Sequence, residues 1–96
     1  MNLVPMQSTP SDQSLIEYPS LFPIKVMGVN VDGYADAVVE IARRFDPKLD
    51  DSLIETRLSS GNKYLAITVT VTATSREQLD ELYRALSSHP MVKVVL

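Results

Sequence analysis

Residues 64–74 read Tyr-Leu-Ala-Ile-Thr-Val-Thr-Val-Thr-Ala-Thr, an almost perfect alternation of apolar and hydroxyl-bearing side chains. Successive side chains of a β-strand point to opposite faces of a sheet, so this period of two predicts a strand with one buried face. The β-branched Val, Ile and Thr favour the same structure, because they lose rotamer freedom in a helix. The apolar row, which should face the core, is Leu65, Ile67, Val69, Val71 and Ala73.

The chain before this strand predicts a strand, a helix and another strand. Residues 21–29 alternate, with Phe22, Ile24, Val26 and Gly28 on the inward side. Asp32 is placed to accept hydrogen bonds from the free N–H groups of a helix start, and Pro47 ends that helix. The core stripe of this helix is expected to be Ala35, Val38, Val39, Ala42 and Phe45. Residues 54–59 alternate again, and Ser60-Gly61-Asn62 supplies a tight connection that makes a hairpin.

The chain after this strand predicts a helix and a final strand. Ser75 and Gln78 have the spacing of a capping box, and His89-Pro90 stops the helix. Its core stripe is expected to be Leu79, Leu82, Tyr83 and Leu86. Residues 91–96 form the last strand, in which the alternation predicts that Val92, Val94 and Leu96 point inward.

The resulting order, βαββαβ, predicts an α+β ferredoxin-like sandwich. Its four-stranded antiparallel sheet should carry both helices on one face, with the first and third strands central. We expect a single domain over residues 15–96. Residues 1–14, rich in proline and polar residues, should form a flexible N-terminal tail, and Leu15, Ile16 and Tyr18 are apolar enough to lie against the domain.

The amino-acid composition argues against several classes of function. The 96 residues contain no cysteine, so disulfides and thiolate chemistry are excluded, and a reducing cytoplasm is compatible with the chain. The net charge of −3 gives no basic field for phosphates and argues against nucleic-acid binding. No apolar stretch is long enough for a membrane span or an export signal, so we expect a soluble cytoplasmic protein.

No group of residues has the pattern of a catalytic or metal centre. The single histidine, His89, follows a helix and is expected to interact with the C-terminus of that helix. Asp46, Asp50 and Asp51 lack the spacing of a calcium loop and predict a solvated loop. Ser75 is explained by helix capping. We therefore expect no enzyme, no metal and no cofactor.

Two surfaces are candidates for binding. The first is the loop after the first strand, where backbone N–H groups and a helix start could hold a small-molecule effector; its residues are Gly28, Asn30, Asp32 and Gly33. The second is the open face of the sheet, which could meet a protein partner or a second copy. We expect the open face to carry Lys25, Met27, Arg57, Tyr64, Thr68, Thr70, Lys93 and Val95. RNA-binding domains of this topology stack bases on two or three aromatic side chains, whereas this face offers only Tyr64.

Three segments, Phe22–Gly28, Ser59–Tyr64 and Met91–Leu96, resemble the YbeD-like (UPF0250) family of small bacterial proteins, and the likeness covers residues 15–96. The resemblance implies a ferredoxin-like fold similar to the ACT-type regulatory domains, and it brings no established activity. In ACT domains the effector usually lies at a dimer interface near the loop after the first strand, which corresponds loosely to Gly28–Gly33 here. The leading hypothesis is a non-enzymatic interaction or regulatory module, and the alternative is an ACT-type sensor of amino acids or short carboxylic acids.

Overall fold

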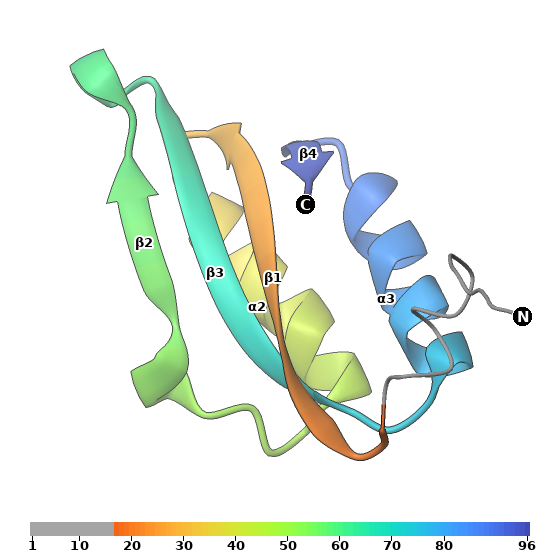
Figure 1. The fold of residues 1–96 in the computed structure, drawn as a ribbon. Coiled ribbons are helices and arrows are strands. Elements are labelled where there is room, and N and C mark those ends of the chain that lie inside the picture. The colour runs from red at the N-terminus through yellow and green to blue at the C-terminus, as the bar shows by residue number, and fades with distance from the viewer. Residues whose placement is uncertain (1–16) are drawn as a thin grey trace, which may run out of the picture.

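A computed structural model of the protein describes residues 17–96, whose elements follow the order β–α–β–β–α–β (Figure 1). The strands and helices are β1 (Ser20–Val29), α2 (Tyr34–Phe45), β2 (Glu55–Leu58), β3 (Tyr64–Ala73), α3 (Arg76–Ser87) and β4 (Val92–Val95). Two 3₁₀ turns, η2 (Asp51–Leu53) and η3 (Ser60–Asn62), flank β2. The expected tail over residues 1–14, and Leu15 and Ile16 at the expected start of the domain, lie outside the described residues.

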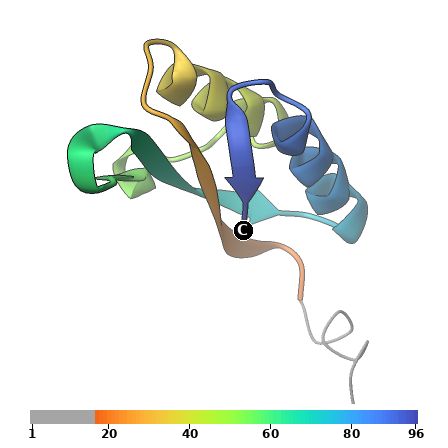
Figure 2. The ribbon, with the colours of Figure 1, turned by 90° about the horizontal axis from the view of Figure 1, so that it is seen from above.

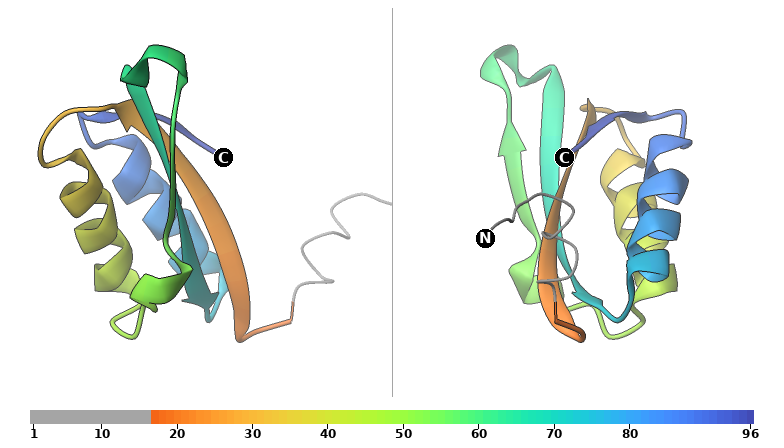
Figure 3. Two further views of the ribbon diagram at one scale, coloured as in Figure 1. Left: turned by 90° about the vertical axis from the view of Figure 1, so that its left-hand side faces the viewer. Right: turned by 45° about the vertical axis from the view of Figure 1, so that its right-hand side comes forward.

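The strands form one antiparallel sheet in the order β2-β3-β1-β4. The two ten-residue strands, β1 and β3, pair along their whole length at the centre. Both helices pack on the same side of the sheet, and no helix of residues 17–96 covers the other side (Figures 2 and 3). We call this uncovered side the open face. The ferredoxin-like prediction is confirmed.

The core lies between the sheet and the two helices. Ile67, Val69, Val71 and Ala73 of β3 are buried, as their alternation predicted. Ile24 and Val26 of β1 lie beside them and meet buried side chains from both helices, which are Tyr34, Val38, Ile41, Ala42, Leu79, Leu82 and Leu86. The apolar stripes of the two helices therefore close over one row of each central strand.

The start of α2 differs from the prediction. Gly33, with φ of 87°, is the N-cap, whereas the side chain of Asp32 is exposed and caps nothing. The left-handed backbone of a glycine turns the chain sharply here, and this turn brings Tyr34 to the first helical position. Tyr34 is fully buried, and its hydroxyl donates a 2.9 Å hydrogen bond to the Val26 carbonyl. A Cβ at Gly28 would lie 2.4 Å from both the Tyr34 ring and the Met91 carbonyl, so only glycine fits beneath this ring.

The inward row predicted for the last strand is partly wrong because β4 carries a bulge. Gly28 pairs with Val92 whereas Met27 pairs with Val94, so Lys93 is an extra residue without a partner in the ladder. One extra residue exchanges the two faces beyond it. Val95 therefore packs against the core, while Val94 and Leu96 lie on the open face.

Pro23 lies on β1 opposite Thr70 of β3. Lys25 and Leu96 exchange two backbone hydrogen bonds, which shows that Lys25 directs its N–H and C=O toward β4. Backbone directions alternate along a strand, so the nitrogen of Pro23 points to the same side, beyond the last β4 pairing. A proline is tolerated on this central strand because no hydrogen bond of the β1–β4 ladder is required there.

The polar ends of the helices depart slightly from the predicted caps. The Ser75 hydroxyl accepts the Gln78 N–H at 3.0 Å as expected, but the Gln78 side-chain oxygen accepts the N–H of Thr74 instead of that of Ser75. At the other end of α3 the C-cap is Ser88, not His89. The Nδ1 atom of His89 accepts the N–H of Met91, so this ring shapes the turn into β4.

Candidate functional site

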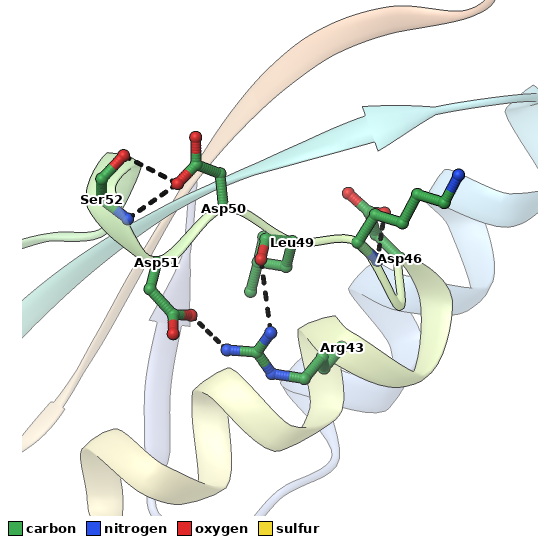
Figure 4. Close-up of polar contacts among 7 residues, drawn as sticks. Arg43, Asp46, Leu49, Asp50, Asp51 and Ser52 are labelled. Atoms are coloured by element: carbon green, nitrogen blue, oxygen red, sulfur yellow. Dashed lines mark hydrogen bonds and ion pairs between the residues drawn. The ribbon is translucent and has the colours of Figure 1, made fainter.

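The three aspartates that follow α2 serve the structure (Figure 4). Asp46 is buried, and its two carboxylate oxygens accept the N–H of Lys48 at 3.1 Å and the N–H of Thr72 at 2.8 Å. The pairing of β2 with β3 ends at Thr68, so Asp46 occupies the β3 edge that β2 leaves open. The prediction of a solvated loop is therefore wrong for Asp46.

The other two aspartates are exposed. Asp51 forms an ion pair with Arg43, whose guanidinium also donates to the Leu49 carbonyl. Asp50 accepts from the hydroxyl and the N–H of Ser52, and these hydrogen bonds lower its pKa below the ordinary value. Each carboxylate is thus engaged by its own local donors, as Figure 4 shows for Arg43 with Asp51 and Ser52 with Asp50.

The loop proposed for an effector is engaged in contacts of its own. The Asn30 side chain donates a 3.0 Å hydrogen bond to the Asn62 carbonyl, and the Asn30 N–H donates to the Lys63 carbonyl. Gly28 is packed under Tyr34, so its surroundings are filled. The sequence-predicted residues Asp32 and Gly33 are exposed at the turn into α2. The loop, which connects β1 to α2, is therefore also held by hydrogen bonds from Asn30 to the hairpin of β2 and β3.

The open face carries two neighbouring hollows. The first, of about 300 Å³, is lined by Lys25, Met27, Arg57, Leu58, Ser59, Tyr64, Ala66 and Leu96. The second, of about 250 Å³, is lined by Lys25, Glu55, Thr56, Arg57, Ala66 and Thr68. They share Lys25, Arg57 and Ala66, so they form one continuous depression over β1, β2 and β3. We call it the open-face groove.

The apolar end of the groove is exposed to solvent. Leu96 is 63% exposed and Tyr64 is 39% exposed, and the half-buried Met27 lies between them in the sheet. Val94, 44% exposed, is the β4 partner of Met27 and extends the same apolar surface. Large apolar side chains gathered on one face of a small protein mark a contact surface more often than isolated ones do.

The side-chain charges of Lys25 and Arg57 in the groove are not used in ion pairs within residues 17–96. Two ion pairs occur within residues 17–96, Arg43 with Asp51 and Arg76 with Asp80, and neither involves Lys25 or Arg57. Lys63 adds a third cation at the Tyr64 end, where its Nζ lies 5.5 Å from the centre of the Tyr64 ring. The acidic chain thus places two cations, Lys25 and Arg57, in this groove beside a single acidic residue, Glu55.

The structure brings together most of the residues predicted for the open face. Lys25, Met27, Arg57 and Tyr64 line the first hollow, and Thr68 lines the second. Thr70 lies further along β3, opposite Pro23, and lines neither hollow. The expectation for Val95 is wrong, since this side chain packs against the core, and Lys93 lies in the bulge.

The sequence analysis missed Val94 and Leu96 on this face. The run Val92-Lys93-Val94-Val95-Leu96 contains two adjacent valines, so either of two alternations fits it. Gly28 on the partner strand was the available signal, because glycine within a strand often marks a bulge.

Comparison with known proteins places the chain among uncharacterised bacterial sequences. A family model described as a protein of unknown function (DUF493) matches residues 13–96. A UPF0250 protein of Leptothrix cholodnii is 63% identical over 91 residues, which cover 95% of this chain and 100% of the relative. A UPF0250 protein of Ralstonia nicotianae is 60% identical over 89 residues, which cover 93% and 92%.

Two solved structures share the fold. The ACT domain from the GTP pyrophosphokinase of Chlorobium tepidum aligns with a TM-score of 0.64 at 14% identity and covers 80% of this chain and 83% of that one. Protein HP0495 from H. pylori aligns with a TM-score of 0.67 at 18% identity and covers 95% and 98%. These likenesses confirm the ACT-like fold that the sequence resemblance implied. Within residues 17–96, no helix has the length and apolar character needed to cross a membrane.

Proposed function

The chain belongs to the UPF0250 (DUF493) family of proteins of unknown function, and from this premise we propose that it is a non-enzymatic binding module that engages a protein partner through the open-face groove. One observation carries the proposal. The open face has no helix of residues 17–96 on it, and it combines exposed apolar side chains with the cations Lys25 and Arg57. Interfaces are enriched in aromatic residues, Met and Arg, and this groove contains Tyr64, Met27 and Arg57.

The alternative of a small-molecule sensor has less support. Its expected site, the loop from Gly28 to Gly33, lines none of the hollows described above, and Asn30 is occupied by the hairpin. An enzymatic function also finds little support in the groove. The Ser59 hydroxyl, which lines the first hollow, accepts the N–H of Tyr64 at 2.9 Å and so has a role in the hairpin.

Ala66 is the position for a decisive variant, because it lines both hollows and its side chain is only half-buried. Ala66→Arg should fill the groove with a long charged side chain. Ser87→Arg is the matched control, since it adds the same charge at an exposed position at the end of α3.

The test is quantitative affinity capture from a bacterial lysate by the immobilised wild type and by both variants. We expect proteins that the wild type and Ser87→Arg retain and that Ala66→Arg loses. Equal capture by all three would refute the proposal. Sedimentation of the wild type accompanies the capture, and a self-association that Ala66→Arg abolishes would assign the groove to a second copy instead.

A further inference from the structure

The two hollows of the open-face groove differ in chemistry. The first is bounded mainly by apolar side chains, among them Met27, Tyr64 and Leu96. The second is bounded by the side chains of the polar Glu55 and Thr68 together with Ala66. Lys25 and Arg57 line both hollows. A ligand that fills the whole groove therefore has an apolar part and a polar part, with the two cations at the junction.

The exposure of the hollows to solvent, not their size, favours a chain segment over a small molecule. Pockets for small ligands typically hold about 300–1,000 Å³ and enclose most of the ligand. The hollows here measure about 300 and 250 Å³. Several of their bounding residues, including Lys25, Arg57 and Leu96, are exposed, so neither hollow encloses its contents. Such a groove suits a segment that lies across the sheet and places one side chain in each hollow.

The charges indicate the character of that segment. Lys25 and Arg57 have no ion-pair partner in the part of the chain that the structure describes, and Glu55 is the one acidic residue in the two linings. Carboxylates on the ligand would complement these cations, and arginine can bind a carboxylate through two parallel hydrogen bonds.

Two other classes of macromolecule fit less well. An anionic membrane surface is usually read by clusters of about four to eight Lys or Arg residues, which exceeds the cations of this groove. Single-stranded nucleic acid needs several aromatic faces for stacking. The groove offers the ring of Tyr64, and the ammonium group of Lys63 lies over that ring.

We propose that the open-face groove binds an extended acidic segment of the partner protein, with an apolar side chain in the first hollow and a neighbouring carboxylate at Lys25 and Arg57. This inference rests on the proposed function and specifies the chemistry of the partner. Leu96 and Met27 hold the apolar side chain, and Thr68 borders the path of the following residues.

The test is a selection of displayed random peptides on the immobilised full chain, with Ala66→Arg selected in parallel to subtract binding outside the groove. We expect the groove-dependent peptides to be enriched in Asp and Glu next to a large apolar residue. The double variant Lys25→Glu, Arg57→Glu should enrich Lys and Arg instead. Both positions are exposed, so these variants should fold, and thermal melting checks that they do.

One enriched peptide, labelled with fluorescein, then gives affinities by fluorescence anisotropy. Lys25→Ala and Arg57→Ala should each weaken binding about tenfold, which corresponds to about 1.4 kcal/mol. Lys48→Ala, an exposed cation outside the groove, should leave the affinity unchanged.

The outcomes distinguish a failure of the acidic segment alone from a failure of the groove. Groove-dependent peptides without an acidic bias, or affinities that ignore Lys25 and Arg57, would overturn the acidic segment and leave the binding module intact. Peptides enriched equally on the wild type and on Ala66→Arg would remove the acidic segment and count against the groove itself.

Discussion

On the helix-covered face of the sheet, β3 contributes Ile67, Val69 and Val71, all fully buried, whereas on the open face the same strand presents half-buried threonines and Ala66. The covered row is bounded by both helices, so its side chains are fixed by packing. The open row borders a groove and is free of that constraint. One strand thus supplies stability with one row and a binding surface with the other, and substitutions on the two rows should have separable effects.

The largest effect should come from the covered face. Ile67→Ala removes buried methyl groups from the centre of the core and should lower the free energy of unfolding by about 2–5 kcal/mol. Thr70→Ala on the open row is the comparison and should cost about 1 kcal/mol or less. Chemical denaturation measures both, and the reverse ranking would show that the two faces are assigned the wrong way round.

Substitutions at Asp46 test how much the hydrogen bond from the end of α2 to β3 contributes to stability. Asp46→Ala leaves the Thr72 N–H without its acceptor and should cost about 1–3 kcal/mol. Asp46→Asn keeps a side-chain oxygen that can accept this hydrogen bond, so it should cost less. Urea unfolding of both variants checks this order, and equal losses would mean that the charge, not the hydrogen bond, stabilises the contact.

Tyr34 tests the close packing beneath α2. Tyr34→Phe removes the hydrogen bond to the Val26 carbonyl and should cost about 1 kcal/mol in the free energy of unfolding. The Phe ring retains the packing against Gly28, so the fold should persist. A loss as large as that of Ile67→Ala would indicate that the hydroxyl also fixes the position of β1.

The same residue predicts a dependence on pH. Burial raises the pKa of Tyr34 to about 12, above the value near 10 of an unfolded chain. The folded state therefore holds this proton more tightly, and the stabilisation is complete below pH 10 and is lost as the pH rises toward 12. The slope should approach about 1.4 kcal/mol per pH unit between these values. Tyr34→Phe should flatten it, although partial burial also raises the pKa of Tyr83 and leaves a residual slope.

The smallest effect on stability should come from the open face outside the groove. Thr70→Arg places a charged side chain where solvent can receive it, so the free energy of unfolding should change by about 0.5 kcal/mol or less. Because Thr70 lines neither hollow, partner capture should be weakened less than by Ala66→Arg. Unfolding of the Thr70→Arg variant would show that another part of the protein covers this face.

The fold was predictable because its signals are local. The alternation in β3, the stop at Pro47 and the serine cap of α3 each lie within a few residues, and each indicates the element that forms. Tyr34 was missed although it lies four residues before Val38, on the same stripe of α2. Aspartate is a common N-cap residue, so the sequence predicted the cap at Asp32, whereas Gly33 is the N-cap and the helix begins at Tyr34.

The groove was only half predictable because it depends on contacts between distant segments. Lys25, Arg57 and Tyr64 follow from the strand periods, but Leu96 joins them only through the bulge, where β4 meets Gly28. Asp46 is similar, since its partner Thr72 lies 26 residues further along the chain. Periodicity assigns a residue to a face of its own strand, whereas the register between strands decides which faces meet.

Pro23 has a consequence for how copies of this protein behave when crowded together. In the described chain β4 ends its pairing at Lys25, so the first part of β1 is in effect a sheet margin, where another strand could attach and extend the sheet. At Pro23 such a strand would find no donor, and the neighbouring backbone would have to pair around a rigid ring. A strand added at this margin would therefore lack one hydrogen bond of the ladder, which disfavours extension of the sheet from one copy to the next.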